Sequence, residues 1–256
     1  MKFWREAIAV ARRLVIELIR RRRSLIFWAI FPITVLVLNA SILAERAQLE
    51  RGAAYELAAP PTLVGAALFF SCLGGSVATV VSEREQQTLK RLFMSPLSGT
   101  AYFCGIFMAH AGIGFGQMLL VGLIAALAGA TLSGSWWLSL GVVALSIVAY
   151  VGVGFILGTQ LARRTEDVNA LVATFGVPLL ILGGAFLPTS LFPSHLLEIA
   201  QFNPIYHMTE ALSAVTGGEV WADIQPHLLF LGLFAIAVTI AGWLSYRRMV
   251  AVERRL

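Results

Sequence analysis

Six long apolar runs divide this chain, and each is long enough to cross a membrane as a helix. They cover residues 24–44, 61–82, 101–130, 138–162, 168–187 and 227–246. A helix of about 20 apolar residues spans a hydrocarbon core of about 30 Å. None of the six runs contains Asp, Glu, Lys or Arg. The predicted fold class is therefore an all-α polytopic membrane protein with six transmembrane helices, built as one domain over residues 1–256.

The basic residues predict the orientation of these spans. If the N-terminus lies in the cytoplasm, six crossings leave 17 of the 19 Lys and Arg residues on the cytoplasmic side, and only Arg46 and Arg51 outside. Positive charge collects on the cytoplasmic side of membrane proteins. We therefore expect both termini in the cytoplasm. A basic membrane face suits anionic lipids of the inner leaflet, so we expect membrane lipids, and no nucleic acid, as its partners.

The segment 1–23 has the pattern of an amphipathic helix. Its apolar positions follow helical spacing along one face: Phe3, Ala7, Val10, Leu14 and Leu18. Such a helix lies in the membrane interface rather than crossing the bilayer. Contact with a cytoplasmic partner is the alternative that this pattern leaves open.

Two external segments connect pairs of spans, one between spans one and two and the other between spans five and six. Loop 45–60 leads into Pro60 and Pro61, which we expect to stop one helix before the second span restarts it. Segment 188–226 contains no Lys or Arg and many apolar residues, so we predict an external re-entrant segment of short helices. Ser194 is expected to cap one of these helices, and Asn203 to begin another at Pro204.

The chemistry of the chain excludes several function classes. Proton- and sodium-coupled carriers place ionisable groups inside the membrane, and the candidate here is His110 alone. The two lysines, Lys2 and Lys90, do not follow a glycine, so no phosphate-binding loop is present. His207 and Glu210 share i, i+3 spacing, which we interpret as a polar helix surface rather than a metal site. We predict no catalytic residue, no metal and no cofactor on this chain, which is not an enzyme by itself.

The inner loop at 83–97 carries the clearest functional signal. Ser82 and Glu85 have the spacing of a capping box. Leu89, Leu92 and Phe93 then share one face at i, i+3 and i+4, and Pro96 stops the helix. We predict a short amphipathic helix at the cytoplasmic mouth of spans two and three. A helix that rests on lipid is the alternative.

At this point the chain resembles a known family, the ABC-2 type permeases, which are the membrane subunits of ABC exporters of the fold also called type V. The resemblance covers nearly the whole chain. Its inner-loop motif reads Glu83-Arg84-Glu85, Thr88-Leu89, Leu92 and Ser95-Pro96-Leu97, its glycine turn runs from Gly183 to Pro188, and its Asn-Pro motif runs from Asn203 to Met208. The chain departs from the family pattern at Gln87, where glycine is frequent, and at Ser213, where Arg or Lys is frequent.

The resemblance implies partners and roles for particular residues. It implies cytoplasmic ABC ATPase subunits that bind ATP and Mg, a second permease subunit that we expect to be an identical copy, and a bacterial-type cytoplasmic (inner) membrane. Segment 1–23 would be the connecting helix and 83–97 the coupling helix. The residues expected to couple to the ATPase are Glu83, Arg84, Glu85, Leu89, Lys90, Arg91, Leu92 and Phe93. Those expected to line the pathway are Phe69, Phe70, Thr79, Asn169, Thr174, Phe175 and Phe186. Those expected at the external gate are Pro188, Asn203, Pro204 and Tyr206.

The first function hypothesis is therefore the permease subunit of an ATP-driven exporter. An apolar, nearly uncharged pathway favours lipid-like, drug-like or other amphipathic cargo, moved out of the cytoplasm or inner leaflet by alternating access of a permease dimer. A stand-alone secondary carrier or channel is the alternative. A third hypothesis is a membrane scaffold or an intramembrane enzyme, and no hydrolase or protease motif supports the enzyme.

Overall fold

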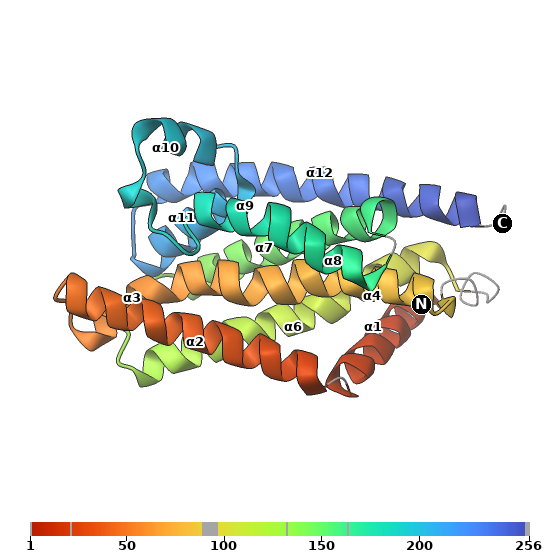
Figure 1. The fold of residues 1–256 in the computed structure, drawn as a ribbon, viewed down its shortest axis with the longest axis horizontal. Coiled ribbons are helices and arrows are strands. Elements are labelled where there is room, and N and C mark those ends of the chain that lie inside the picture. Colours follow the sequence, from red (N-terminus) through yellow and green to blue (C-terminus); the bar gives the residue numbers. More distant parts are fainter. Residues whose placement is uncertain (1, 21, 89–96, 132, 163, 254–256) are drawn as a thin grey trace.

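The computed structural model describes residues 2–253 except 21, 89–96, 132 and 163. All regular structure in these residues is helical, and the long helices run along one axis as a bundle (Figure 1). Six helices in this part of the chain are long and apolar enough to cross a membrane: Arg22–Arg46, Arg51–Glu85, Gly99–Leu127, Trp136–Leu161, Thr165–Leu182 and Trp221–Ala251. The predicted all-helical class and the predicted number of membrane-length apolar helices are thus confirmed; we call these six helices spans one to six.

Several of these spans consist of more than one element. The elements, in chain order, are α1 (Lys2–Arg20), α2 (Arg22–Arg46), α3 (Arg51–Thr62), η1 (Leu63–Gly74), α4 (Gly75–Glu85), α6 (Gly99–Leu127), α7 (Trp136–Ile156), η2 (Leu157–Leu161), α8 (Thr165–Leu171), η3 (Val172–Gly176), α9 (Val177–Leu182), η4 (Thr189–Leu191), α10 (Ser194–Ala200), α11 (Pro204–Thr216) and α12 (Trp221–Glu253). Span two is the continuous helix α3–η1–α4, span four is α7–η2, and span five is α8–η3–α9. The segments η1, η2 and η3 are π-helical, whereas η4 is a 3₁₀ turn.

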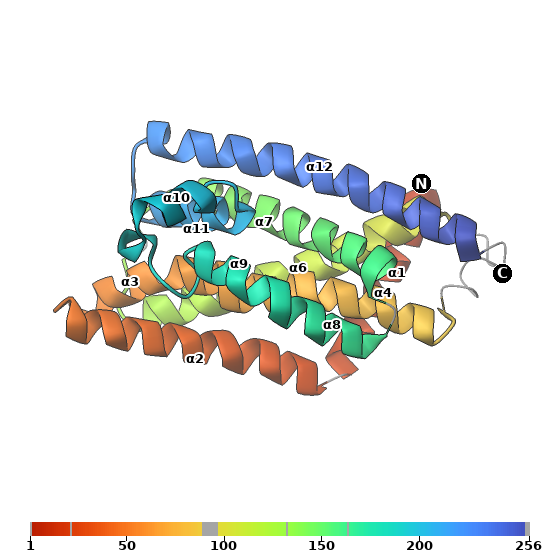
Figure 2. The ribbon, with the colours of Figure 1, turned by 45° about the horizontal axis from the view of Figure 1, so that its top comes forward.

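Span two forms the centre of the bundle. In its most apolar stretch 78% of the residues are buried, against 17% in span one and 22% in α12. Figures 1 and 2 show α2, α6, α7 and α8–α9 arranged around it. Small residues allow this close packing, because a Cβ atom added at Gly65 would lie 2.5 Å from the Cβ of Ala185.

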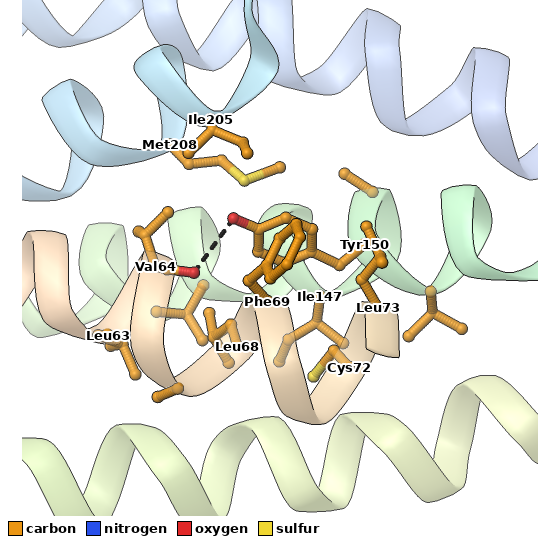
Figure 3. Packing of buried hydrophobic residues seen from close by; sticks show 14 of the residues in the cluster. Leu63, Val64, Leu68, Phe69, Cys72, Leu73, Ile147, Tyr150, Ile205 and Met208 are labelled. Carbon is orange, nitrogen blue, oxygen red and sulfur yellow. Dashed lines mark hydrogen bonds between the residues drawn. The ribbon is translucent and has the colours of Figure 1, made fainter. Parts of the chain in front are cut away.

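The prolines at the start of span two do not interrupt it. The helix begins at Arg51 and continues through Pro60 and Pro61 into η1, so the predicted stop at these prolines is wrong. Membrane helices tolerate proline where a local π-helical adjustment accommodates it, and here η1 follows at once. The Tyr150 hydroxyl of α7 donates to the Val64 carbonyl of η1 at 3.1 Å, which joins this stretch to span four (Figure 3).

The core lies where η1 meets α7 and α11. Phe69 is 2% exposed and meets the ring of Tyr150 edge-on, with 5.7 Å between the centroids. Ile205 and Met208 of α11 close this core from above in Figure 3. A Cβ atom added at Gly176 would lie 2.3 Å from the ring of Phe69, so span five also approaches η1 closely.

The N-terminal helix packs against protein through its predicted apolar face. Ala7, Val10, Leu14 and Leu18 are buried, and a Cβ atom added at Gly105 of α6 would lie 2.6 Å from the Cβ of Val10. Phe3 of the predicted face is exposed instead, and Trp4, Ile8 and Ile19 are exposed beside it. The helix therefore has two apolar surfaces, one buried against α6 and one exposed.

The two ends of the bundle differ in charge. The start of α1, the end of α4, the start of α8 and the end of α12 lie at one end (Figures 1 and 2). We call it the basic end because Arg13, Arg84 and Arg247 belong to α1, α4 and α12, and Arg164 directly precedes α8. The opposite end holds the start of α3 together with α10 and α11.

Candidate functional site

The Glu83-Arg84-Glu85 tripeptide lies in the last turn of α4, at the basic end. The helix ends at Glu85, and the chain turns at Gln87, where φ is +54°. The predicted capping box is therefore wrong, since these residues finish a helix instead of beginning one. The Ser82 hydroxyl accepts a hydrogen bond from the Gln86 side-chain amide at 3.1 Å. Successive residues of a helix point about 100° apart, so the three side chains reach three different neighbours.

Glu83 joins α4 to α1 and α6. Its carboxylate accepts hydrogen bonds from the Arg13 guanidinium and from the Tyr102 hydroxyl. Glu83 is only 5% exposed. A buried carboxylate is tolerated only where charged and hydrogen-bonding partners compensate for the lost water. This triad therefore attaches the N-terminal helix to spans two and three.

Arg84 joins span two to the end of span four. Its Nη1 donates to the carbonyl oxygens of Gly158 at 3.2 Å and Ala162 at 3.3 Å. The last carbonyls of a helix have no partner within it and carry partial negative charge. A guanidinium is well suited to this position, because it offers several donors and a positive charge.

Glu85 joins span two to the start of span five. The Thr165 backbone N–H and hydroxyl donate to its carboxylate at 3.1 and 2.6 Å. Beyond the segment 89–96, the backbone N–H of Ser98 donates to Glu6 of α1 at 3.1 Å, and this bond lowers the pKa of Glu6. We call Glu83, Arg84 and Glu85 the carboxylate–arginine hub.

The structure describes only part of the expected coupling segment. Glu83, Arg84 and Glu85 contact elements of this same chain. The other expected coupling residues lie outside the described residues: Leu89, Lys90, Arg91, Leu92 and Phe93. The sequence pattern did not point to Arg13 or Tyr102 as partners of Glu83, because they are 70 and 19 residues away along the chain.

A groove of about 540 Å³ separates α2, span two and span five. Arg23, Ser24, Thr165 and Asn169 make its lining polar at one end, which is the basic end. Further along, the lining is aromatic and aliphatic: Phe27, Trp28, Phe70, Val172 and Val177. We call this the Arg23 groove; its lining is amphipathic.

Two of the seven residues expected in the pathway, Phe70 and Asn169, line the Arg23 groove. Phe69 is buried in the core instead. Thr174 and Phe175 are exposed on span five, and Phe186 packs partly buried against the core. The remaining residue, Thr79, donates its hydroxyl to the Gly75 carbonyl at 2.9 Å.

His110 is fully buried and takes part in packing. Its Nδ1 lies 3.1 Å from the Ser71 carbonyl, to which it donates, and its Nε2 lies 3.4 Å from the Thr79 hydroxyl. Ser71 belongs to η1, so His110 and Tyr150 each satisfy one backbone carbonyl of the π-helical stretch. Both ring nitrogens of His110 thus face groups of the protein itself.

The glycine turn and the Asn-Pro motif meet at the opposite end. Span five ends at Leu182 and is followed by the capping residue Gly183, and Gly184 adopts φ +78°, a conformation that favours glycine at a helix C-terminus. Asn203 accepts a hydrogen bond from the Ile205 backbone N–H, as predicted, and its amide donates to the Leu179 carbonyl at 2.7 Å. One side chain thus caps α11 and binds the last turn of α9.

The other expected gate residues lie around this junction. Pro204 is the first residue of α11, and Pro188 precedes η4, where the Thr189 hydroxyl donates to Glu210 at 2.8 Å. α10 begins at Ser194 without a side-chain cap, so the predicted role of Ser194 is wrong. The reason is local: Pro193 occupies the capping position.

A histidine pair, which the sequence pattern did not reveal, joins α11 to α12. The Nδ1 atoms of His207 and His227 lie 2.9 Å apart, and the His207 Nε2 donates to the Gln201 carbonyl at 2.8 Å. Tyr206, an expected gate residue, meets both rings edge-on. No group of three potential metal ligands occurs within the described ranges.

A bundle of six membrane-length helices with an amphipathic groove defines a multi-pass membrane protein. Residues 27–244 match the family model described as ABC-2 family transporter protein. The match covers most of the chain, which therefore belongs to the ABC-2 family and is a membrane transport component. No match was found among the curated proteins with which the sequence was compared. Permeases of this family generally work with ATPase partners.

Proposed function

We propose that this chain is the membrane subunit of an ATP-driven exporter, in which two copies pair and two ATPase subunits bind at the basic end. The distribution of Lys and Arg supports a cytoplasmic basic end and cytoplasmic termini. ATP and Mg belong to the partner ATPase. The membrane would be a bacterial-type cytoplasmic membrane.

The carboxylate–arginine hub is the observation that carries this proposal. It contacts α1 and spans three, four and five, and only three described residues separate it from segment 89–96. A force applied to that segment would reach four other elements through charged hydrogen bonds. Such bonds are about twice as strong as neutral ones. This arrangement suits a permease that must respond as one body to ATP binding on a partner.

The Arg23 groove supports the class of cargo. Its polar lining at the basic end would hold a headgroup, and its aromatic lining would hold an apolar body. Ligand sites combine mainly apolar walls with a few placed polar groups. We therefore propose a lipid-like, drug-like or other amphipathic cargo that enters from the cytoplasm or the inner leaflet.

The opposite end would form the external gate of this exporter. Pro188, Asn203, Pro204 and Tyr206 lie where span five, α11 and α12 meet. The short helices α10 and α11 support the proposed re-entrant segment. Alternating access would open the junction between α9 and α11 when the hub moves.

Purification of the tagged chain from its host in mild detergent tests the proposal. An ATP-binding subunit that co-purifies in roughly equal amount, with ATP hydrolysis in the same sample, is the expected result. An abundant permease without any ATPase would overturn the exporter hypothesis and favour a stand-alone carrier or channel.

A variant in the coupling segment tests the docking site. Combined Leu92→Asp and Phe93→Asp substitution is expected to abolish cargo-stimulated ATP hydrolysis while the permease stays folded, because an apolar docking face no longer forms. Gln86→Asp, which adds one charge in the exposed turn before this face, is the control and should keep the stimulation. Full stimulation in the double variant would exclude this docking face.

A further inference from the structure

A second groove opens between spans two, three and four and α11, and we name it the Gly122 groove. Its volume is about 310 Å³. Ala59 and Leu63 come from span two, Met118 and Gly122 from α6, and Leu212 from α11. None of the described residues that line it carries a charge. The polar side-chain groups among them are two hydroxyls and one indole N–H, from Ser139, Thr216 and Trp136.

The groove opens toward the surroundings of the bundle, which in a membrane are lipid chains. Leu119, Leu123 and Trp136 line it and are 70, 59 and 62% exposed. Its other walls are hidden: Leu63 and Leu212 are 5 and 3% exposed. An apolar cavity does not hold water well, and an empty one forfeits dispersion contacts. The occupant must therefore be apolar and must come from the bilayer.

The shape of the Gly122 groove selects a single chain. Along α6 the lining runs from Met118 to Ala126, which is about 12 Å at 1.5 Å per residue. A Cβ atom added at Gly122 meets no other atom within 4 Å, so the missing side chain leaves a notch beside the exposed Leu119 and Leu123. A helix is about 10 Å wide with its side chains. A notch one side chain wide therefore admits an acyl chain and not a helix of a second copy.

The depth of the groove along the bundle indicates which leaflet and which part of a lipid would occupy it. Trp136 begins α7 at the opposite end of the bundle, and tryptophan favours the level of the headgroups. Half of a hydrocarbon core is about 15 Å thick, which matches a groove of about 12 Å that begins at this level. From these observations we propose that the Gly122 groove is a binding site for one acyl chain of an outer-leaflet lipid, which packs against α11.

The test uses the full chain in nanodiscs of phosphatidylethanolamine and phosphatidylglycerol, doped with a phosphatidylethanolamine that carries a diazirine in mid-chain. After illumination, mass spectrometry locates the adducts. A bound chain is expected to label Leu63 and Leu212, which surrounding lipid does not reach because they are buried in the bundle. Adducts confined to exposed positions such as Leu119 and Leu123 would overturn the proposal.

Two glycine variants of α6 provide a matched pair. A Cβ atom added at Gly122 or at Gly116 meets no other atom within 4 Å, so both positions accept a larger side chain. Gly122→Phe fills the groove and should reduce labelling of Leu63 and Leu212 several-fold, whereas Gly116→Phe, outside the groove, should leave it unchanged. Gly122→Leu is a milder replacement if the Phe variant folds poorly. Equal labelling in both variants would also overturn the proposal.

Discussion

The basic end and the opposite end of the bundle are held together by different chemistry. At the basic end, Glu83 and Glu85 take donors from three other elements, and Arg84 reaches a fourth. At the opposite end, separate bonds each join one pair of elements: the Asn203 amide joins α11 to span five, the Thr189 hydroxyl joins η4 to α11, and the His207–His227 pair joins α11 to α12. Motion imposed at the hub is therefore expected to reach four elements from one tripeptide, whereas the bonds of the opposite end are divided among separate junctions.

The largest expected effect is the loss of Glu83. Glu83→Ala leaves the Arg13 guanidinium and the Tyr102 hydroxyl without their acceptor. Breaking a buried ion pair costs 3–5 kcal/mol, and because the Arg13 side chain is 37% exposed we expect about 3 kcal/mol. Thermal or denaturant unfolding in detergent measures this loss. Glu166→Gln, at an exposed residue of the same end, is the control, and an equal loss in both variants would contradict a special role of Glu83.

A smaller effect is expected from Asn203 at the opposite end. Asn203→Ala removes a helix cap, worth about 1 kcal/mol, and one hydrogen bond to the Leu179 carbonyl, worth about 1 kcal/mol more. Asn203→Asp keeps the cap and loses only the amide donor. The free energy of unfolding should thus fall in two steps across the Asp and Ala variants. Identical values for the two would show that the bond to α9 contributes nothing.

Matched threonine variants, one at each end of the bundle, test the difference between the ends directly. The Thr165 hydroxyl donates to Glu85 at 2.6 Å, and the Thr189 hydroxyl donates to Glu210 at 2.8 Å. Thr189→Val should cost about 1 kcal/mol of stability, and Thr165→Val should cost less, because its hydrogen bond is exposed to solvent. Only Thr165→Val, at the hub, is expected to reduce cargo-stimulated ATP hydrolysis in the reconstituted complex. Equal reduction by both variants would contradict the difference between the ends.

The smallest expected effect is a pH dependence at the opposite end. Burial lowers the pKa of His207 from its ordinary value of 6.5, although the Gln201 carbonyl opposes this and Glu210 lies nearby. His207 already donates from Nε2, so a second proton on Nδ1 would point at the Nδ1 of His227. The folded state therefore favours the neutral form of His207. Its contribution to stability is present above pH 6.5 and is lost as the pH falls toward the lowered pKa.

Unfolding temperatures between pH 7.5 and pH 5 measure this dependence. His207→Phe should flatten the profile, because it removes the titrating group. His195→Asn changes an exposed histidine and should keep the profile of the unaltered chain. A profile that stays unchanged in His207→Phe would assign the pH dependence to other groups.

Sequence patterns over a few residues predicted the structure correctly where membrane hydropathy or the chemistry of a single turn determines it. The six apolar runs became six membrane-length helices, because a chain of this hydropathy satisfies its backbone most readily as helices. Asn203 caps α11 as its position before Pro204 predicted. The prediction at Ser82 failed because the capping pattern falls inside a helix that the packing of span two extends to Glu85.

The candidate site was only partly predictable. The motif pointed to Glu83, Arg84 and Glu85, but it gave no sign that they bind Arg13, the end of η2 and Thr165. These partners are far away along the chain, and no pattern of local spacing encodes such contacts. Phe69 and Phe70 show the same limit, since neighbours of one residue type lie in the core and in the groove respectively.

Amino-acid order alone thus determined the helical class, the number of membrane-length helices and the cap at Asn203, because hydropathy and turn chemistry act over a few residues. Tertiary packing decided that span two passes through Pro60 and Pro61, and that Glu83 is buried and paired with the half-buried Arg13. It also decided where two grooves remain open. Those outcomes depend on helices that meet only after folding, and on donors and acceptors whose partners the bundle brings together.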